Sequence, residues 1–140
     1  MSIATAIKTL QTEQSNGVSA LIDDRAYLAE LPETPGYPCT VHVGVSDNQD
    51  RVHPGESDNR GGNGLYTSRW QIDSYADSYS ECEQLAKELD RLFTPLKRHP
   101  VSDTIITSCR RLSGRPVRET GVDKWRMIAE YEFMYEYLTD

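Results

Sequence analysis

Long apolar runs are absent from this sequence of 140 residues. No stretch approaches the roughly 20 apolar residues that a membrane-spanning helix needs. The first ten residues lack a basic start, a continuous apolar region and a small-residue cleavage site, so we expect no secretory signal and folding in the cytoplasm. With 37% hydrophobic and 26% charged residues, the composition is that of one globular domain spanning residues 1–140.

Cysteine and basic residues are also scarce. Cys39, Cys82 and Cys109 are far apart and odd in number, which favours buried thiols over a disulfide framework. Fifteen basic residues stand against 22 acidic ones, giving a net charge of −7. A protein that binds nucleic acid by neutralising phosphates normally has the opposite balance, so sequence-specific nucleic-acid binding is not expected.

A catalytic constellation is missing as well. Cys39 and His42 are three residues apart, which places them on opposite faces of a strand, and no second such pair follows. His53 and His99 fall in loop-like segments. The glycines in 61–64 are not preceded by a strand or followed by a Lys-Ser/Thr pair, which excludes a phosphate-binding loop. We therefore expect no enzymatic activity, no metal site and no cofactor.

The clearest signal begins with a strand over Tyr66–Tyr75. Residues alternate there between an apolar and a polar side, which is typical of a half-buried strand. From Ser78 the apolar spacing changes to three and four, which predicts an amphipathic helix. Five residues of this strand and helix are predicted to form the core: Trp70, Ile72, Leu85, Leu89 and Phe93.

The ends of this helix are marked in the sequence. Ser78 and Glu81 have the spacing of a capping box, in which side chains satisfy backbone groups of the first turn. Pro95 cannot continue a helix and restricts the residue before it. The helix is therefore predicted to end near Phe93 or Thr94.

Segments before this stretch give mixed signals. An amphipathic helix is predicted over residues 3–14, whereas 18–31 fits either a helical turn or a first strand around 25–29. Alternation over 39–45 predicts a strand. The following segment, 46–64, is polar and rich in turn formers, which predicts a long mobile loop.

Two further strands are predicted after the helix. One covers 103–112, with either Ile105 and Cys109 or Ile106 and Leu112 facing inward, and a turn follows it at Gly114, Pro116 and Gly121. The other covers 125–137, with seven apolar or aromatic residues in alternation. We therefore expect an α+β domain with a mainly antiparallel sheet of four or five strands and two helices packed on one face.

Charged and aromatic residues near the strand ends are candidate contacts. The arginines of 110–118 lie opposite acidic residues of the last strand, which fits either cross-strand pairing or contact between neighbouring copies. The aromatic end of the last strand fits a subunit interface. The candidate contact residues are Asp47, Arg51, Arg60, Arg110, Arg111, Arg115, Arg118, Tyr135 and Tyr137.

The order of these features resembles a known family. A first helix, a proline-marked entry to a valine-rich strand, a long polar loop, the segment Trp70–Ala76 before an amphipathic helix, and two closing strands are similar to the tail completion or tail terminator proteins of long-tailed bacteriophages. This is the lambda-type minor tail protein family, which includes tail-to-head joining proteins. Gln71, Ile72 and Asp73 match its motif, whereas Ser74 stands where an apolar residue is commoner.

The resemblance implies a structural subunit of a virion. Such a protein forms a homo-oligomeric ring, usually a hexamer, at the head-proximal end of the tail, stops polymerisation of the tail tube and presents a surface to the head–tail connector. Its partners would be the tail tube protein and the connector or stopper protein, with assembly in the host cytoplasm. An acidic wall would let DNA pass without holding it.

Two other functions remain open on the sequence. A neck or head-completion connector would also assemble as a ring, but at another position in the particle. A small-molecule-binding or enzymatic α+β domain would instead need a pocket with convergent polar groups.

Overall fold

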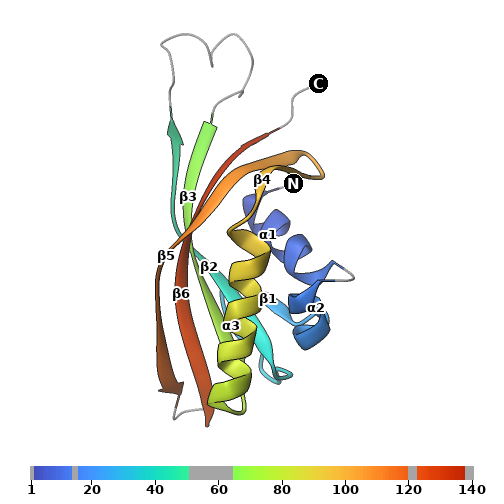
Figure 1. Ribbon diagram of the computed structural model, residues 1–140, viewed down its shortest axis with the longest axis vertical. Helices are drawn as coiled ribbons and strands as arrows, with labels where there is room; N and C mark the ends of the chain where they lie inside the picture. The colour runs from blue at the N-terminus through green and yellow to red at the C-terminus, as the bar shows by residue number, and fades with distance from the viewer. Residues whose placement is uncertain (1, 14–15, 51–64, 120–122, 138–140) are drawn as a thin grey trace.

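A computed structural model describes residues 2–13, 16–50, 65–119 and 123–137 of the chain. In this part of the chain, six strands form one sheet in the order β1-β2-β3-β6-β5-β4, and three helices lie on one side of it (Figure 1). The elements are α1 (Ile3–Thr12), α2 (Gly17–Ile22), β1 (Ala26–Leu28), β2 (Cys39–Asp50), β3 (Leu65–Ala76), α3 (Tyr79–Phe93), β4 (Lys97–Val101), β5 (Thr104–Glu119) and β6 (Lys124–Tyr137).

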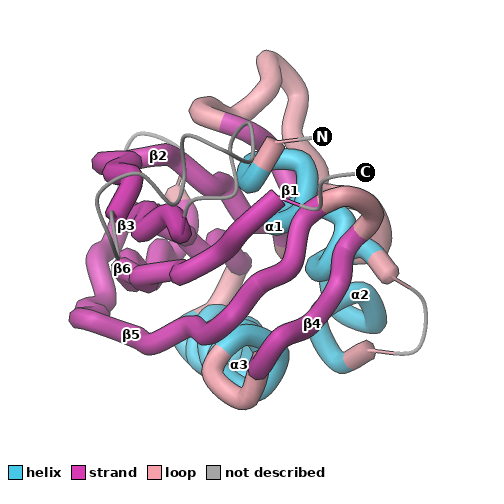
Figure 2. The backbone as a smooth tube through the Cα atoms, turned by 90° about the horizontal axis from the view of Figure 1, so that it is seen from above, coloured by secondary structure: helices cyan, strands magenta, loops and turns pink. Residues whose placement is uncertain are grey.

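The expected sheet of four or five mainly antiparallel strands with two helices is wrong. The sheet has six strands and is mixed, because β1 runs parallel to β2. It curls around the helices, as the view from above shows (Figure 2). The strand that the sequence did not predict, β4, has five residues; β1 and α2, which the sequence offered as a strand and a helical turn within 18–31, have three and six. Such segments are too short to display a period, so tertiary pairing decides them.

Strand β4 was not predicted because its residues are unusual for a strand. It contains Pro100 and two basic residues, and Arg98 has a positive φ of 47°. Proline is tolerated in an edge strand, where its missing N–H faces away from the ladder. Pairing with β5, rather than local preference, therefore defines β4.

Strand β5 is longer than predicted and contains two β-bulges. It runs for 16 residues through Gly114 and Pro116, which were assigned to a turn. Register shifts lie between Ile106 and Ser108 and between Arg111 and Ser113. Because a bulge reverses which side later residues face, Ile106 and Cys109 are both buried. Neither of the two predicted registers is therefore correct.

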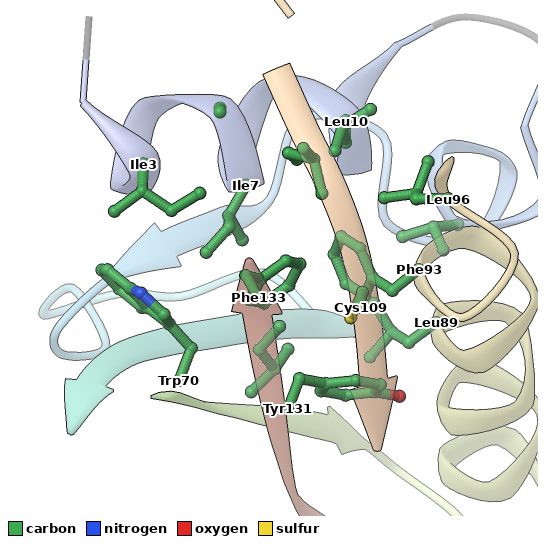
Figure 3. Packing of buried hydrophobic residues seen from close by; sticks show 14 of the residues in the cluster. Ile3, Ile7, Leu10, Trp70, Leu89, Phe93, Leu96, Cys109, Tyr131 and Phe133 are labelled. Atoms are coloured by element: carbon green, nitrogen blue, oxygen red, sulfur yellow. The ribbon is translucent and has the colours of Figure 1, made fainter. Parts of the chain in front are cut away.

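Helix α3 follows the sequence prediction closely. It covers Tyr79–Phe93, with Ser78 as N-cap accepting a hydrogen bond from the Glu81 amide at 3.2 Å. Its apolar stripe packs on the sheet side that we call the helix face (Figure 1). The β6 residues opposite are aromatic: the Phe93 ring lies 5.5 Å from that of Tyr131 and 5.3 Å from that of Phe133 (Figure 3).

All five predicted core residues are buried. Their exposures range from 0% for Ile72, Leu85 and Phe93 to 7% for Trp70. Helix α1 completes this core with Ile3, Ile7 and Leu10, which line the same cluster (Figure 3).

The other side of the sheet, which we call the open face, has a small core of its own. Cys39, Val41 and Tyr75 are buried together there, with Tyr37 of the proline-rich segment packed against them. The Tyr37–Pro38 peptide bond is cis. The segment before β2 thus covers part of the open face, so the apolar residues at 39 and 41 belong to this second cluster.

Truncating Leu89 to alanine should lower the free energy of unfolding by about 2–5 kcal/mol, because it removes a fully buried side chain and leaves a cavity. Lys87→Ala on the exposed side of the same helix is the matched control and should change it by less than about 0.5 kcal/mol. Denaturant titration of both variants measures the difference, and equal effects would contradict the assignment of the α3 core stripe.

Candidate functional site

The three cysteine thiols, Cys39, Cys82 and Cys109, are buried. No group of three or more His, Cys, Asp or Glu residues is placed to hold a metal ion among the described residues. Burial raises the pKa of the Cys39 thiol to about 12 and that of Cys82 to about 11, and it also raises the pKa of Cys109. Such thiols pack as small apolar groups and are poor nucleophiles.

His42 is buried on the helix face, on the opposite side of β2 from Cys39. Its exposure is 0%, its ring lies 5.9 Å from the Trp70 ring, and neither ring nitrogen has a hydrogen-bond partner among the described residues. Burial, together with the Lys8 charge, lowers the pKa of His42 to about 4. The imidazole is therefore neutral at pH 7 and packs as an aromatic ring.

Among the described residues, no helix is both long enough and apolar enough to cross a membrane.

The aromatic end of β6 packs within the subunit. Tyr135 is fully buried, its ring stacks on Tyr66 at 5.3 Å, and its hydroxyl donates to Asp47 Oδ1 at 2.8 Å. Tyr137 is half-buried and lies edge-on to both tyrosine rings. Tyr135, one of the two predicted aromatic contacts, is thus not available at the surface. Asp47, another predicted contact residue, has a hydrogen-bond partner inside the subunit.

An open hollow lies next to this cluster, where the β2–β3 hairpin extends past α1. It has a volume of about 280 Å³ and is lined by Ile3, Gly44, Val45, Ser46, Asp47, Ser68 and Trp70. Its polar groups bind each other: Trp70 Nε1 donates to Ser68 Oγ at 2.7 Å, and Ser68 Oγ donates to the Ser46 carbonyl at 3.2 Å. Trp70 Nε1 and the Ser68 hydroxyl are therefore already hydrogen-bonded within the subunit.

Part of the predicted mobile loop belongs to this hairpin. Residues 46–50 are strand and pair with β3 from Arg69 to Leu65. Val45 sits at a β-bulge and is 52% exposed. Arg51 and Arg60, both predicted contacts, lie outside the described residues, as do residues 51–64 as a whole.

Three of the four predicted β5 arginines pair with acids inside the subunit. Arg110 Nε donates to Glu132 Oε1 at 2.9 Å across the open face. Arg118 pairs with Asp123, and its guanidinium lies 5.6 Å from the Trp125 ring centre. Cross-strand pairing therefore accounts for Arg110, while exposed pairs of this kind add little stability.

Arg111 takes part in an interaction that the sequence does not reveal. Its Nη1 donates to Asp90 Oδ2 of α3 at 2.8 Å, and the other carboxylate oxygen of Asp90 accepts from the Tyr131 hydroxyl. Burial and the Asp90 carboxylate raise the pKa of Tyr131. Gly114 provides the space, since a Cβ there would lie 1.8 Å from Arg111 Nη2. A charged network thus joins α3, β5 and β6.

A second unpredicted ion pair lies on the open face. Arg126 Nη2 donates to Asp73 Oδ2 at 2.7 Å, and Asp73 is only 2% exposed. Gln71 Nε2 also donates to this carboxylate at 3.1 Å. Asp73 belongs to the segment that carries the family resemblance, but only the β3–β6 register brings it to Arg126.

Arg115 differs from the other arginines of β5. It is exposed, and no ion pair or hydrogen bond of its side chain is found among the described residues. It is therefore the predicted contact residue on β5 whose charge is not paired with another described residue.

Replacing Asp90 by alanine should lower the free energy of unfolding by about 1–3 kcal/mol, because the buried Tyr131 hydroxyl loses its acceptor. Adding Tyr131→Phe to Asp90→Ala should recover part of this loss. Denaturant titration compares the variants, with Glu83→Ala at a half-buried position of α3 as control. A double variant no more stable than Asp90→Ala would contradict the role of the hydrogen bond.

Lowering the pH from 7 to 5 should destabilise the fold by about 1–2 kcal/mol through His42 alone. In the unfolded chain the imidazole takes up a proton near pH 6.5, whereas its folded pKa is about 4. Stability is therefore full above pH 6.5 and is lost as the pH falls towards 4. A His42→Phe variant should have a flatter pH dependence in denaturant titrations; an unchanged slope would show that other groups cause it.

Comparison with known proteins identifies a shared fold. No protein-family model matches the sequence, and no curated protein matches it. Among solved structures, a chain from the virion of a native gene transfer agent (GTA) particle superposes with a TM-score of 0.63. The match covers 94% of this chain and 93% of that chain at 13% sequence identity. At this identity the match shows the fold alone.

Proposed function

We propose that this chain is a structural protein of a phage-like virion. The observation that carries the proposal is the end-to-end match to a chain of a GTA virion, in which almost no part of either chain is left over. A whole-length match supports a common role more than a match to one motif would, although fold alone does not fix function. The family resemblance of the sequence supports the same role independently.

Within the virion, we assign the chain to the head-proximal end of the tail. There it would form a ring that terminates tail-tube polymerisation and joins the tail to the head, as the resemblance to tail terminator proteins implies. A neck or head-completion connector is the alternative position. The role is assembly rather than catalysis, and it needs surfaces rather than a reactive pocket.

The charge of the chain fits this role. Any ring of such subunits carries a net charge of −7 per copy. Negative walls do not hold phosphates, so DNA could pass a ring of this kind without binding to it.

Imaging particles that contain a labelled copy of the protein tests the proposal. The label should appear in the particle, at the junction of head and tail. A label at the distal tip of the tail would contradict the terminator role, and a label on the head side of the neck would favour the connector role. No label in any particle would remove the virion role itself.

A further inference from the structure

We propose that β1 and its flanking acidic residues in one copy of the chain bind the free edge of β5 in a second copy. This contact rests on the proposed assembly function, and it names the two surfaces that would join neighbouring subunits. We call them the acidic edge and the basic edge.

The two edges lie at the same height along the strands, at opposite ends of the strand order. Two rows of paired residues cross the sheet from β1 to β5: Ala26–Thr40–Ser74–Met127–Pro116 and Leu28–His42–Ile72–Ala129–Gly114. In Figure 1 the lower half of β5 lies at the left margin, whereas β1 lies with α2 towards the right. Copies placed side by side at one height would bring these edges together.

Both edges lack a neighbouring strand in the described part of the chain. Strand β1 is at the end of the sheet and pairs only with β2. Strand β4 pairs with β5 no further than Ser108, so β5 from Cys109 to Glu119 has β6 on one side only. Free edges of a sheet are surfaces where another chain can bind.

The acidic edge carries a group of exposed carboxylates. Asp23 and Asp24 precede β1, Glu30 and Glu33 follow it, and all four are exposed. None of them forms an ion pair with another described residue. Leu28, between the two pairs, is 54% exposed and is the most exposed of the large hydrophobic residues described.

The basic edge carries the complementary charge. Arg115 is exposed and has no ion-pair partner in the described chain, whereas Arg111 and Arg118 on either side of it are exposed but already pair with Asp90 and Asp123. Half-buried Val117 offers an apolar side chain next to Arg115. A surface of two apolar residues among opposite charges suits a specific, salt-sensitive contact.

A second copy is the partner that fits both edges at once. The complementary surfaces are carried by one chain, so each copy can bind two others head to tail, and such contacts close into a ring when the rotation permits. Side chains rather than a continued backbone ladder would make the contact, because Pro116 lacks an N–H donor in the middle of the basic edge.

Reversing one charge on each edge tests the contact. Arg115→Glu and Glu30→Arg are made separately, with Lys87→Glu and Glu83→Arg on α3 as controls of equal charge change. Sedimentation velocity from about 10 μM to about 1 mM covers weak association. The wild type should self-associate, and its association should weaken as the salt concentration is raised. Each edge variant alone should associate at least about tenfold more weakly than the wild type.

Mixing the two edge variants should restore association, because each copy then meets an opposite charge on both sides. The inference is overturned if the wild type stays monomeric over the whole range, if the mixture fails to associate, or if the α3 controls weaken association as much. A monomeric wild type that is nevertheless labelled in particles would reject this contact while the virion role stands. If the wild type associates as expected but no particle is labelled, the contact stands and the virion role is rejected.

Discussion

The apolar stripe of α3 packs against the aromatic side of β6, and the rest of the fold is arranged around this contact. Phe93 packs edge-on against both Tyr131 and Phe133, and Leu85 and Leu89 belong to the same cluster. Apolar burial of this kind supplies most of the stability of a small domain. Because α3 is fixed against the middle of the sheet, α1 and α2 complete the same layer beside it, and the sheet curls around all three helices (Figure 2).

The polar groups near this core are arranged so that few buried atoms lack a partner. Asp90 accepts from both Tyr131 and Arg111, and Asp73 accepts from Arg126 and Gln71. His42 is an exception, and it avoids the cost of burying a charge by staying neutral. These internal pairs use up charges that would otherwise serve as contact surface. Arg115 and the acidic residues around β1 form no ion pair with another described residue, and we base the assembly interface on these charges.

Candidate contacts were less predictable from the sequence than core residues. A buried position is set by local periodicity, so Trp70, Ile72 and Leu89 could be identified from spacing alone. A surface charge is free or paired according to which strand lies beside it, and this separates Arg115 from Arg110 although both lie on β5. Tyr135 shows the same limit: alternation identified its face, but only Tyr66 and Asp47 make it a core residue.

The sequence by itself determined the long periodic elements. The α3 cap at Ser78, its end at Phe93, and the apolar sides of β3 and β6 all follow from local spacing and capping chemistry, which need no distant partner. Tertiary structure alone decided β4, the parallel pairing of β1, the two bulges of β5 and the order of the strands. These features depend on backbone hydrogen bonds between segments far apart in the chain. The sequence shows no periodic pattern for a strand of three to five residues or for a one-residue shift in register.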